Sequence, residues 1–570
     1  MDKKTKMKEK KASGIWKKVL GICLAVIMVI GMTMPAWAQI DAESKGSIKV
    51  TADESGWTAS AYRVIDVNFD FDNQQPKEPA YVWNKNAAEW VRTNFKDYIE
   101  ADGNGVTEAF ITMDTDKDAV KVKEFADKMS SAIAADTIQM GAAGSVQPGE
   151  GQTESTIGNL SMGGYLLLMT GGSKIYSPVF THIYPKFSDD TKEWAIVDGD
   201  ITITAKGTNP TIKKTVKNAD GKEISTTAIG DTVTYELTVD IPVYPDSANV
   251  KTFVFGDVLP SGVALVEDSV AINPSGAQTD LSEHFIKTEG KFEYSVKDYG
   301  NLKTAVNGAS QIIVTYKAKV VSEAYETPDN LKNVAYLKYN SVSYNTQGVE
   351  KKINVDRQLY TYGVKIKKVD NKDENTALQG AEFALKKGDT EIKFAKSGKM
   401  YYPAADGDAK LTTDGNGEML IAGLDLGTYT LTETKAPSGY TLPRNPETTI
   451  TLSEKDAVNG TLDESKAEGT NVKANSASVD TQKTWQLNFV LTNGKSNYDH
   501  GRSGNASYIC DPQKQKIGSF RKKRKKFRTE NRQRKGRKTN RERKRQKEKG
   551  LSVCAKKEKA ENGTINAGRY

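Results

Sequence analysis

The sequence predicts a mainly β protein in which a mixed α+β N-terminal domain is followed by tandem immunoglobulin-like β-sandwiches. Short alternating segments, separated by turns rich in Gly, Pro, Asn and Asp, recur from residue 208 to residue 495. Helical spacing of apolar residues occurs before them, between residues 87 and 135. A strongly basic stretch with almost no apolar content, residues 521–550, predicts a disordered tail.

Residues 1–38 are predicted to be a secretory signal peptide. Eight lysines lie in residues 1–18, an uncharged run covers residues 19–34, and Ala36-Trp37-Ala38 is a small-x-small cleavage site. A membrane anchor is the alternative, but the apolar run is short and a processing site follows it. We therefore expect a secreted protein that meets the membrane only transiently, through this segment.

The N-terminal domain is expected to span residues 39–207. Alternation predicts strands at residues 46–52, 56–67, 163–170 and 176–185, and residues 141–152 read as a loop. Helices are predicted at residues 87–99 and 118–135. The second helix places Val122, Phe125, Met129 and Ile133 on one stripe, which we expect to pack in the core.

Two β-sandwich domains are predicted next, at residues 208–357 and 358–495. Both consist of short strands such as "DTVTYELTVDI" and "SQIIVTYKAKVV" in the first and "YGVKIKKVD" in the second. After residue 495 the composition changes abruptly, and residues 496–570 are expected to be an atypical basic tail.

The net charge of +8 is unevenly distributed along the chain. Residues 521–550 hold 18 Lys and Arg against 3 Asp and Glu, whereas residues 39–520 carry a net charge of about −15. An exported acidic body is a poor binder of nucleic acid, so no nucleic-acid partner is expected.

Cysteine and histidine usage limits the chemistry that the folded body can perform. Cys23, Cys510 and Cys554 all lie outside residues 39–495, so the body cannot form a disulfide. The three histidines, at positions 182, 284 and 500, are widely spaced. Zinc sites and Ser-His or Cys-His catalysis are therefore disfavoured, and no cofactor is expected.

The segment "DTDKD" places Asp114, Asp116 and Asp118 at the spacing that opens an EF-hand calcium loop. Ala119 stands where that loop needs glycine, and Phe125 stands where it needs the terminal glutamate. We interpret the segment as a solvated turn before a helix and expect no metal site.

Strand parity places three polar residues of the last domain on core-facing positions. Glu433 shares its face with Tyr429 and Leu431 in "YTLTETK". By the same rule Lys368 lies inward on the opening strand "VKIKKVD", and Asn493 lies inward on the closing strand "LNFVLTN". A buried unpaired charge is costly, so these three residues are expected to meet.

The preceding domain repeats this arrangement with Lys214, Asp257 and Asn333. Parity selects Lys214 over its neighbour Lys213, and it selects Asn333 over Asn340. Two such sets in successive domains indicate a common cause.

Two explanations remain open for each set. The first is a buried salt bridge with an asparagine bonded alongside. The second is chemical, because desolvation favours a neutral amine facing a protonated carboxyl. The amine can then attack the asparagine amide carbon while the acid polarises the carbonyl and shuttles protons, which expels ammonia and leaves a Lys–Asn isopeptide bond.

Several motifs of the two predicted sandwich domains resemble those of a known family. "GLDLGTYTLTETKAPSGYTL" and "FVLTNGK" resemble a collagen-adhesin B-type domain, and "NPTIKKTV", "FGDVLPSGV" and "NVAYLKY" resemble the second domain of Gram-positive major pilins. The resemblance covers roughly residues 45–495. It implies isopeptide bonds Lys214–Asn333 and Lys368–Asn493, promoted by Asp257 and Glu433 respectively.

The resemblance also implies a shaft subunit of a cell-wall-associated pilus. A sortase would join neighbouring pilin subunits into a covalent homopolymer through a lysine near the end of the first domain. Lys186 matches the family tripeptide "YPK" in letters, whereas Lys206 matches it in position and faces outward by parity. We prefer Lys206 as the acceptor and keep Lys186 in reserve.

One feature departs from the family pattern. The family resemblance implies an LPxTG-type sorting signal and an apolar span after "VLTNGKS", but the sequence continues with "NYDHGRSGNASYICDPQKQ" and the basic run. We suspect a frameshift, and a genuine basic tail is the alternative.

Two other function classes compete with the shaft subunit. A surface adhesin or minor pilin would bind a host surface protein, but we find no dedicated adhesive domain with a long insertion. An extracellular enzyme is disfavoured by scarce histidine and the lack of a nucleophile motif. The only catalysis expected is self-catalysed isopeptide formation.

Overall fold

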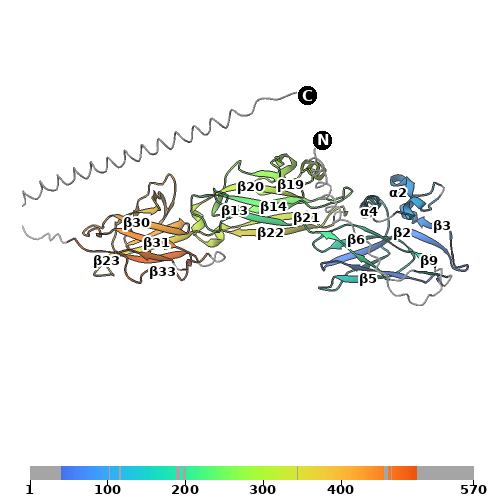
Figure 1. Ribbon diagram of the computed structural model, residues 1–570, viewed down its shortest axis with the longest axis horizontal. Coiled ribbons are helices and arrows are strands. Elements are labelled where there is room, and N and C mark those ends of the chain that lie inside the picture. The colour runs from blue at the N-terminus through green and yellow to red at the C-terminus, as the bar shows by residue number, and fades with distance from the viewer. Residues whose placement is uncertain are drawn as a thin grey trace, which may run out of the picture. The chain divides into compact units, whose positions relative to one another are not determined.

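The computed structural model describes residues 40–496 except residues 102, 114–116, 188–192, 197–199, 343, 455–459 and 464 (Figure 1). The expected signal peptide and, apart from Ser496, the expected basic tail lie outside the described residues. So do Asp114, Asp116, His500 and the three cysteines. No helix in the described part of the chain is long and apolar enough to cross a membrane.

The first group of strands forms two main sheets. One has the order β3-β2-β6-β8 with β4 paired to β2, and the other has the order β11-β1-β5, in which β1 and β11 are parallel. Its strands are β1 (Gly46–Thr51), β2 (Trp57–Asp70), β3 (Gln75–Trp83), β4 (Gly144–Val146), β5 (Glu154–Leu160), β6 (Gly163–Gly171), β7 (Ile175–Tyr176), β8 (Val179–Ile183), β9 (Pro185–Phe187), β10 (Trp194–Ile196), β11 (Asp200–Thr204) and β12 (Gly207–Thr208).

Helices α2 (Lys85–Asn94), α3 (Glu108–Ile111) and α4 (Ala119–Ala134) belong to the same region. The stripe predicted on α4 is confirmed, since Phe125, Met129 and Ile133 are buried and Val122 is half-buried. The helix predicted at residues 87–99 ends earlier, at Asn94, because Phe95 leaves the helical conformation and packs its ring against Phe125.

The structure differs from the prediction at two more places in this region. A 3-10 turn at Lys96–Tyr98 follows Phe95, where the sequence predicted continued α-helix. The loop predicted at residues 141–152 contains the short strand β4, which pairs with β2.

The second group forms a sandwich of two sheets. One has the order β13-β14-β20-β16 with β17 paired to β20, and the other has the order β18-β19-β15-β21-β22. Its elements are β13 (Ile212–Lys217), β14 (Thr232–Asp240), β15 (Phe253–Val258), β16 (Val263–Leu265), β17 (Ala271–Pro274), β18 (Phe285–Lys287), β19 (Phe292–Val296), α5 (Tyr299–Ala305), β20 (Gln311–Val320), β21 (Lys332–Asn340) and β22 (Glu350–Gln358).

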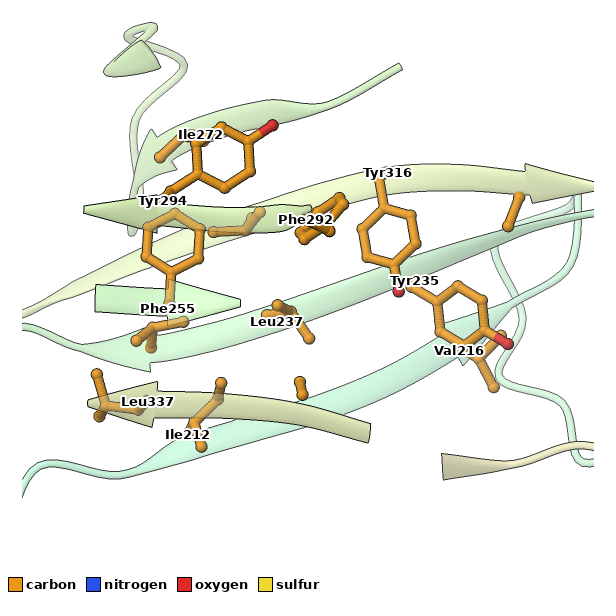
Figure 2. Packing of buried hydrophobic residues seen from close by; sticks show 14 of the residues in the cluster. Ile212, Val216, Tyr235, Leu237, Phe255, Ile272, Phe292, Tyr294, Tyr316 and Leu337 are labelled. Atoms are coloured by element: carbon orange, nitrogen blue, oxygen red, sulfur yellow. The ribbon is translucent and has the colours of Figure 1, made fainter. Parts of the chain in front are cut away.

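The core of this sandwich follows directly from strand alternation. On β14 the buried positions are Val233, Tyr235, Leu237 and Val239, with every second residue outside the core. Figure 2 shows how Tyr235 and Leu237 pack in one cluster with Phe255, Phe292 and Tyr316. Alternating apolar residues on both sheets thus fill the space between them.

The third group forms a second sandwich. Its sheets have the orders β26-β27-β29-β23-β34-β33 and β25-β24-β30-β31-β32, with β28 paired to β24. Its strands are β23 (Tyr362–Asp370), β24 (Glu382–Lys387), β25 (Thr390–Glu391), β26 (Phe394–Ser397), β27 (Met400–Pro403), β28 (Leu411–Thr412), β29 (Glu418–Leu424), β30 (Gly427–Lys435), β31 (Glu447–Leu452), β32 (Lys466–Glu468), β33 (Ser478–Val479) and β34 (Gln486–Asn493).

We propose domains at residues 39–207, 208–357 and 358–495. The strand pairing supports this division, because each of the main sheets draws its strands from one of these ranges, apart from Gln358 at the end of β22. The mainly β fold predicted from alternation is confirmed.

Candidate functional site

The first candidate site lies inside the sandwich of the second group, where Lys214 meets Asp257. The Lys214 Nζ atom donates to both carboxylate oxygens of Asp257, at 2.7 and 2.6 Å, and both side chains are fully buried. Burial lowers the pKa of the Lys214 amine to about 8, and it raises the pKa of the Asp257 carboxyl. The environment therefore moves both groups toward their neutral forms.

Asn333 joins this pair through a residue that sequence reasoning missed. The Asn333 Nδ2 atom donates to the Tyr316 hydroxyl at 2.7 Å, and that hydroxyl donates to Asp257 Oδ2 at 2.7 Å. Tyr316 lies on an inward position of β20, between Val314 and Ala318. Tyrosine is common in β-sandwich cores, so the alternation of β20 accounts for its burial but gives no sign of its bonding.

Strand parity selected the right members of this cluster. Lys213 is exposed while Lys214 is buried, as the alternation on β13 predicts. Asn340, which parity set aside, is buried as well, because it bonds the turn after β21 through Val342 and Val349 instead of the lysine. Parity therefore picked the asparagine that joins the cluster. Its implication that Asn340 faces away from the core is wrong, because Asn340 is buried too.

The second candidate site lies in the third group of strands. The Lys368 Nζ atom donates to Glu433 Oε2 at 2.8 Å and to the carbonyl oxygen of Thr492 at 3.3 Å. Asn493 Nδ2 donates to the other carboxylate oxygen, Oε1, at 2.6 Å. The ion pair is fully buried, and this burial lowers the pKa of the Lys368 amine. One carboxylate therefore contacts both the amine and the amide.

The two clusters are built from different pairs of strands. Lys214 lies on β13 in one sheet of its sandwich, while Asp257 and Asn333 lie on β15 and β21, which are neighbours in the facing sheet. Lys368 and Asn493 instead lie on β23 and β34, which pair in parallel within one sheet. Glu433 alone reaches them from β30 in the facing sheet.

Both asparagines retain an unsatisfied carbonyl oxygen. Oδ1 of Asn333 and Oδ1 of Asn493 are buried and have no hydrogen-bond partner. Leaving a buried acceptor unpaired costs about 1–3 kcal/mol, and native proteins avoid it where nothing else requires it. Each cluster thus holds a desolvated amine, a carboxyl group and an under-bonded amide, which are the groups that amide transfer needs.

The structure describes the two candidate acceptor lysines to different extents. Lys206 is exposed and lies between β11 and β12, and Ile203 and Ala205 beside it are buried, as parity predicts. The backbone of Lys186 lies on β9, opposite Ala195 of β10. The Lys186 side chain is outside the described part of the structure. Among the described residues, no group of three or more His, Cys, Asp or Glu side chains could hold a metal ion.

Comparisons with known proteins agree with the motif resemblance. A family model described as SpaA, prealbumin-like fold domain, matches residues 362–466. The chain is 23% identical over 457 residues to the trypsin-resistant surface T6 protein of Streptococcus pyogenes serotype M6, and the match covers 75% of each chain. These findings confirm the resemblance to Gram-positive major pilins that the motifs predicted.

Two solved pilin structures are similar to this chain. The T6 backbone pilin of S. pyogenes superposes with a TM-score of 0.54 at 16% identity, covering 80% of this chain and 100% of the pilin. The full-length major pilin SpaD from Corynebacterium diphtheriae gives a TM-score of 0.46 at 20% identity, covering 80% of this chain and 98% of SpaD. The T6 likeness shows that this chain shares the pilin fold.

The buried pair generates a prediction about stability. In an Asn333→Ala background, which cannot cross-link, Asp257→Ala should lower the free energy of unfolding by about 3–5 kcal/mol, because Lys214 is left buried without its counter-charge. Pulse proteolysis across a guanidinium series, read from cleavage between residues 208 and 357, measures the change. Lys213→Met at the exposed neighbour is the control and should change it by no more than about 0.5 kcal/mol. A loss below about 1 kcal/mol for Asp257→Ala would contradict the assignment of a tightly coupled pair.

Proposed function

We propose that this chain is a structural backbone subunit of a sortase-assembled surface pilus, and that Lys–Asn isopeptide bonds stabilise its two sandwich domains. The observation that carries the proposal is the buried lysine, acid and asparagine cluster, which occurs once in each of the two sandwiches. The relatives of this chain include a surface protein of S. pyogenes, which supports a secreted, cell-wall-associated location. No other enzymatic activity is proposed.

In the third domain the proposed reaction joins Lys368 to Asn493. Lys368 Nζ, as the free amine, attacks the Asn493 side-chain carbonyl carbon, and the Nζ–Cγ bond forms. The Cγ–Nδ2 bond then breaks, and Nδ2 leaves as ammonia. Glu433 accepts the proton that the amine loses and delivers a proton to Nδ2, so the carboxyl group is regenerated. The hydrogen bonds of Glu433 to both nitrogens support this role.

Lys–Asn isopeptide bonds suit an exported protein whose folded body cannot form disulfides. The folded body, residues 39–495, contains no cysteine, and secreted proteins otherwise use disulfides to restrict the unfolded chain. An isopeptide bond restricts the chain in the same way and cannot be reduced.

The proposed polymer forms through an exposed lysine. Lys206 is accessible beside the junction between the first and second domains, as an amine that attacks a thioacyl-enzyme must be. Its proposed partners are the pilus sortase and neighbouring copies of this chain. A host surface protein would be the additional partner of an adhesive role.

The isopeptide bonds predict a change in mass. The full chain should be lighter than its sequence mass by about 34 Da, since each bond releases one ammonia of about 17 Da. Glu433→Ala and Asp257→Ala should each restore about 17 Da, independently, because the two domains have separate cores. Intact-mass spectrometry with peptide mapping gives both numbers. An unmodified mass for the parent chain would exclude the bonds, and a bond that survives loss of its acid would assign catalysis to another residue.

The acceptor lysine is tested by sortase transfer. With the cognate sortase and a donor peptide carrying a sorting signal, Lys206→Arg should abolish donor attachment, because arginine keeps the charge and is not acylated. Lys186→Arg is the matched control and should leave attachment unchanged. The opposite pattern, read by peptide mapping of the product, would move the acceptor to Lys186. Attachment in the double variant would remove the backbone-subunit proposal.

A further inference from the structure

The hydroxyl of Tyr316 occupies the gap between the acid and the amide of the second domain. It donates to Asp257 Oδ2 and accepts from Asn333 Nδ2, each at 2.7 Å. In the third domain no such residue stands between the two groups, because Glu433 itself accepts from Asn493 Nδ2 at 2.6 Å. Aspartate is shorter than glutamate by one methylene group, and the phenol hydroxyl makes up for the missing reach.

Neighbouring rings hold Tyr316 in this position. Its ring stacks on Tyr235 with centroids 5.2 Å apart and an interplanar angle of 24°, and it packs against Phe292 with centroids 4.5 Å apart (Figure 2). Tyr316 is fully buried. A rigid, desolvated hydroxyl of this kind is preorganised toward the two groups that it contacts.

The protonation state of Tyr316 suits proton transfer. Burial, together with the nearby Asp257 carboxylate, raises the pKa of the phenol far above its ordinary value. The hydroxyl therefore keeps its proton until a stronger base appears beside it. Tyr316 can therefore give its proton to the leaving nitrogen only while it takes another from the protonated Asp257 in the same step.

We propose that Tyr316 is a catalytic residue that relays a proton from Asp257 to the leaving nitrogen of Asn333. The inference rests on the proposed isopeptide function. Lys214 Nζ, as the free amine, bonds to Cγ of Asn333 and gives one proton to Asp257. Tyr316 passes its hydroxyl proton to Asn333 Nδ2 and takes another proton from Asp257. The Cγ–Nδ2 bond then breaks, and Nδ2 leaves as ammonia. Tyr316 and Asp257 both return to the protonation states in which they started.

Tyr235 supplies a matched control for this role. It is equally buried, stacks on Tyr316, and lies beside the lysine, with Lys214 Nζ 5.0 Å from its ring centroid. Of the two phenols, Tyr316 is the one that hydrogen-bonds to Asp257. Tyr235→Phe thus removes a buried hydroxyl that also interacts with Asn333, and it leaves the link from acid to amide through Tyr316 in place.

The test follows bond formation in the full chain during cell-free synthesis, with samples denatured at set times and cross-linked peptides quantified by mass spectrometry. Tyr316→Phe should slow formation of the Lys214–Asn333 bond by about 100-fold or more, the range of general acid catalysis. Tyr235→Phe should change that rate by no more than about threefold. The Lys368–Asn493 bond should form at the parent rate in both variants, because the third domain has its own core and holds neither tyrosine.

A second substitution separates chemistry from structure. Site-specific 3-fluorotyrosine at position 316 keeps the ring and the hydrogen bonds but makes the phenol more acidic, so a relay predicts a changed rate of bond formation and a structural role predicts none. An unchanged rate in either Tyr316→Phe or the fluorinated chain would overturn the relay while leaving the isopeptide function intact. Failure of the parent chain to form either bond would instead remove the proposed function itself.

Discussion

A lysine amine buried in each β-sandwich is the constraint on which the rest of both domains depends. Lys214 and Lys368 have fully buried side chains, and each meets a carboxylate that is equally buried. An ammonium group taken out of water costs several kcal/mol unless a counter-charge or loss of the proton compensates it. The strands that carry the acids must therefore sit in one register, since a shift of one residue would turn the carboxylate to solvent.

The two clusters satisfy this constraint with different topologies. In the second domain the lysine and the asparagine belong to facing sheets, so the proposed bond would tie the two layers together. In the third domain they belong to adjacent parallel strands, β23 and β34, which are the first and last strands of the domain. There the proposed bond would join the first strand of the domain to the last.

This difference has a mechanical consequence under the proposed function. A pull along the chain would pass from Lys368 directly to Asn493 through a covalent bond, so the residues between them would not carry the load. The same reasoning applies to Lys214 and Asn333, although there the force would cross between sheets before leaving through β21 and β22. In both domains hydrogen-bonded ladders would be relieved of a force that covalent bonds withstand far better.

Strand alternation is enough to predict the mainly β fold and the inward direction of Lys214, Asp257, Lys368 and Glu433, because the pleat of a strand fixes the face of every second residue. It did not determine which strands would be neighbours, since alternation carries no information about pairing. Tertiary structure alone therefore decided that one amide would reach its acid directly and the other through Tyr316. It also decided that Asn340 would be buried, because the bonds of a turn depend on chain segments that parity does not relate.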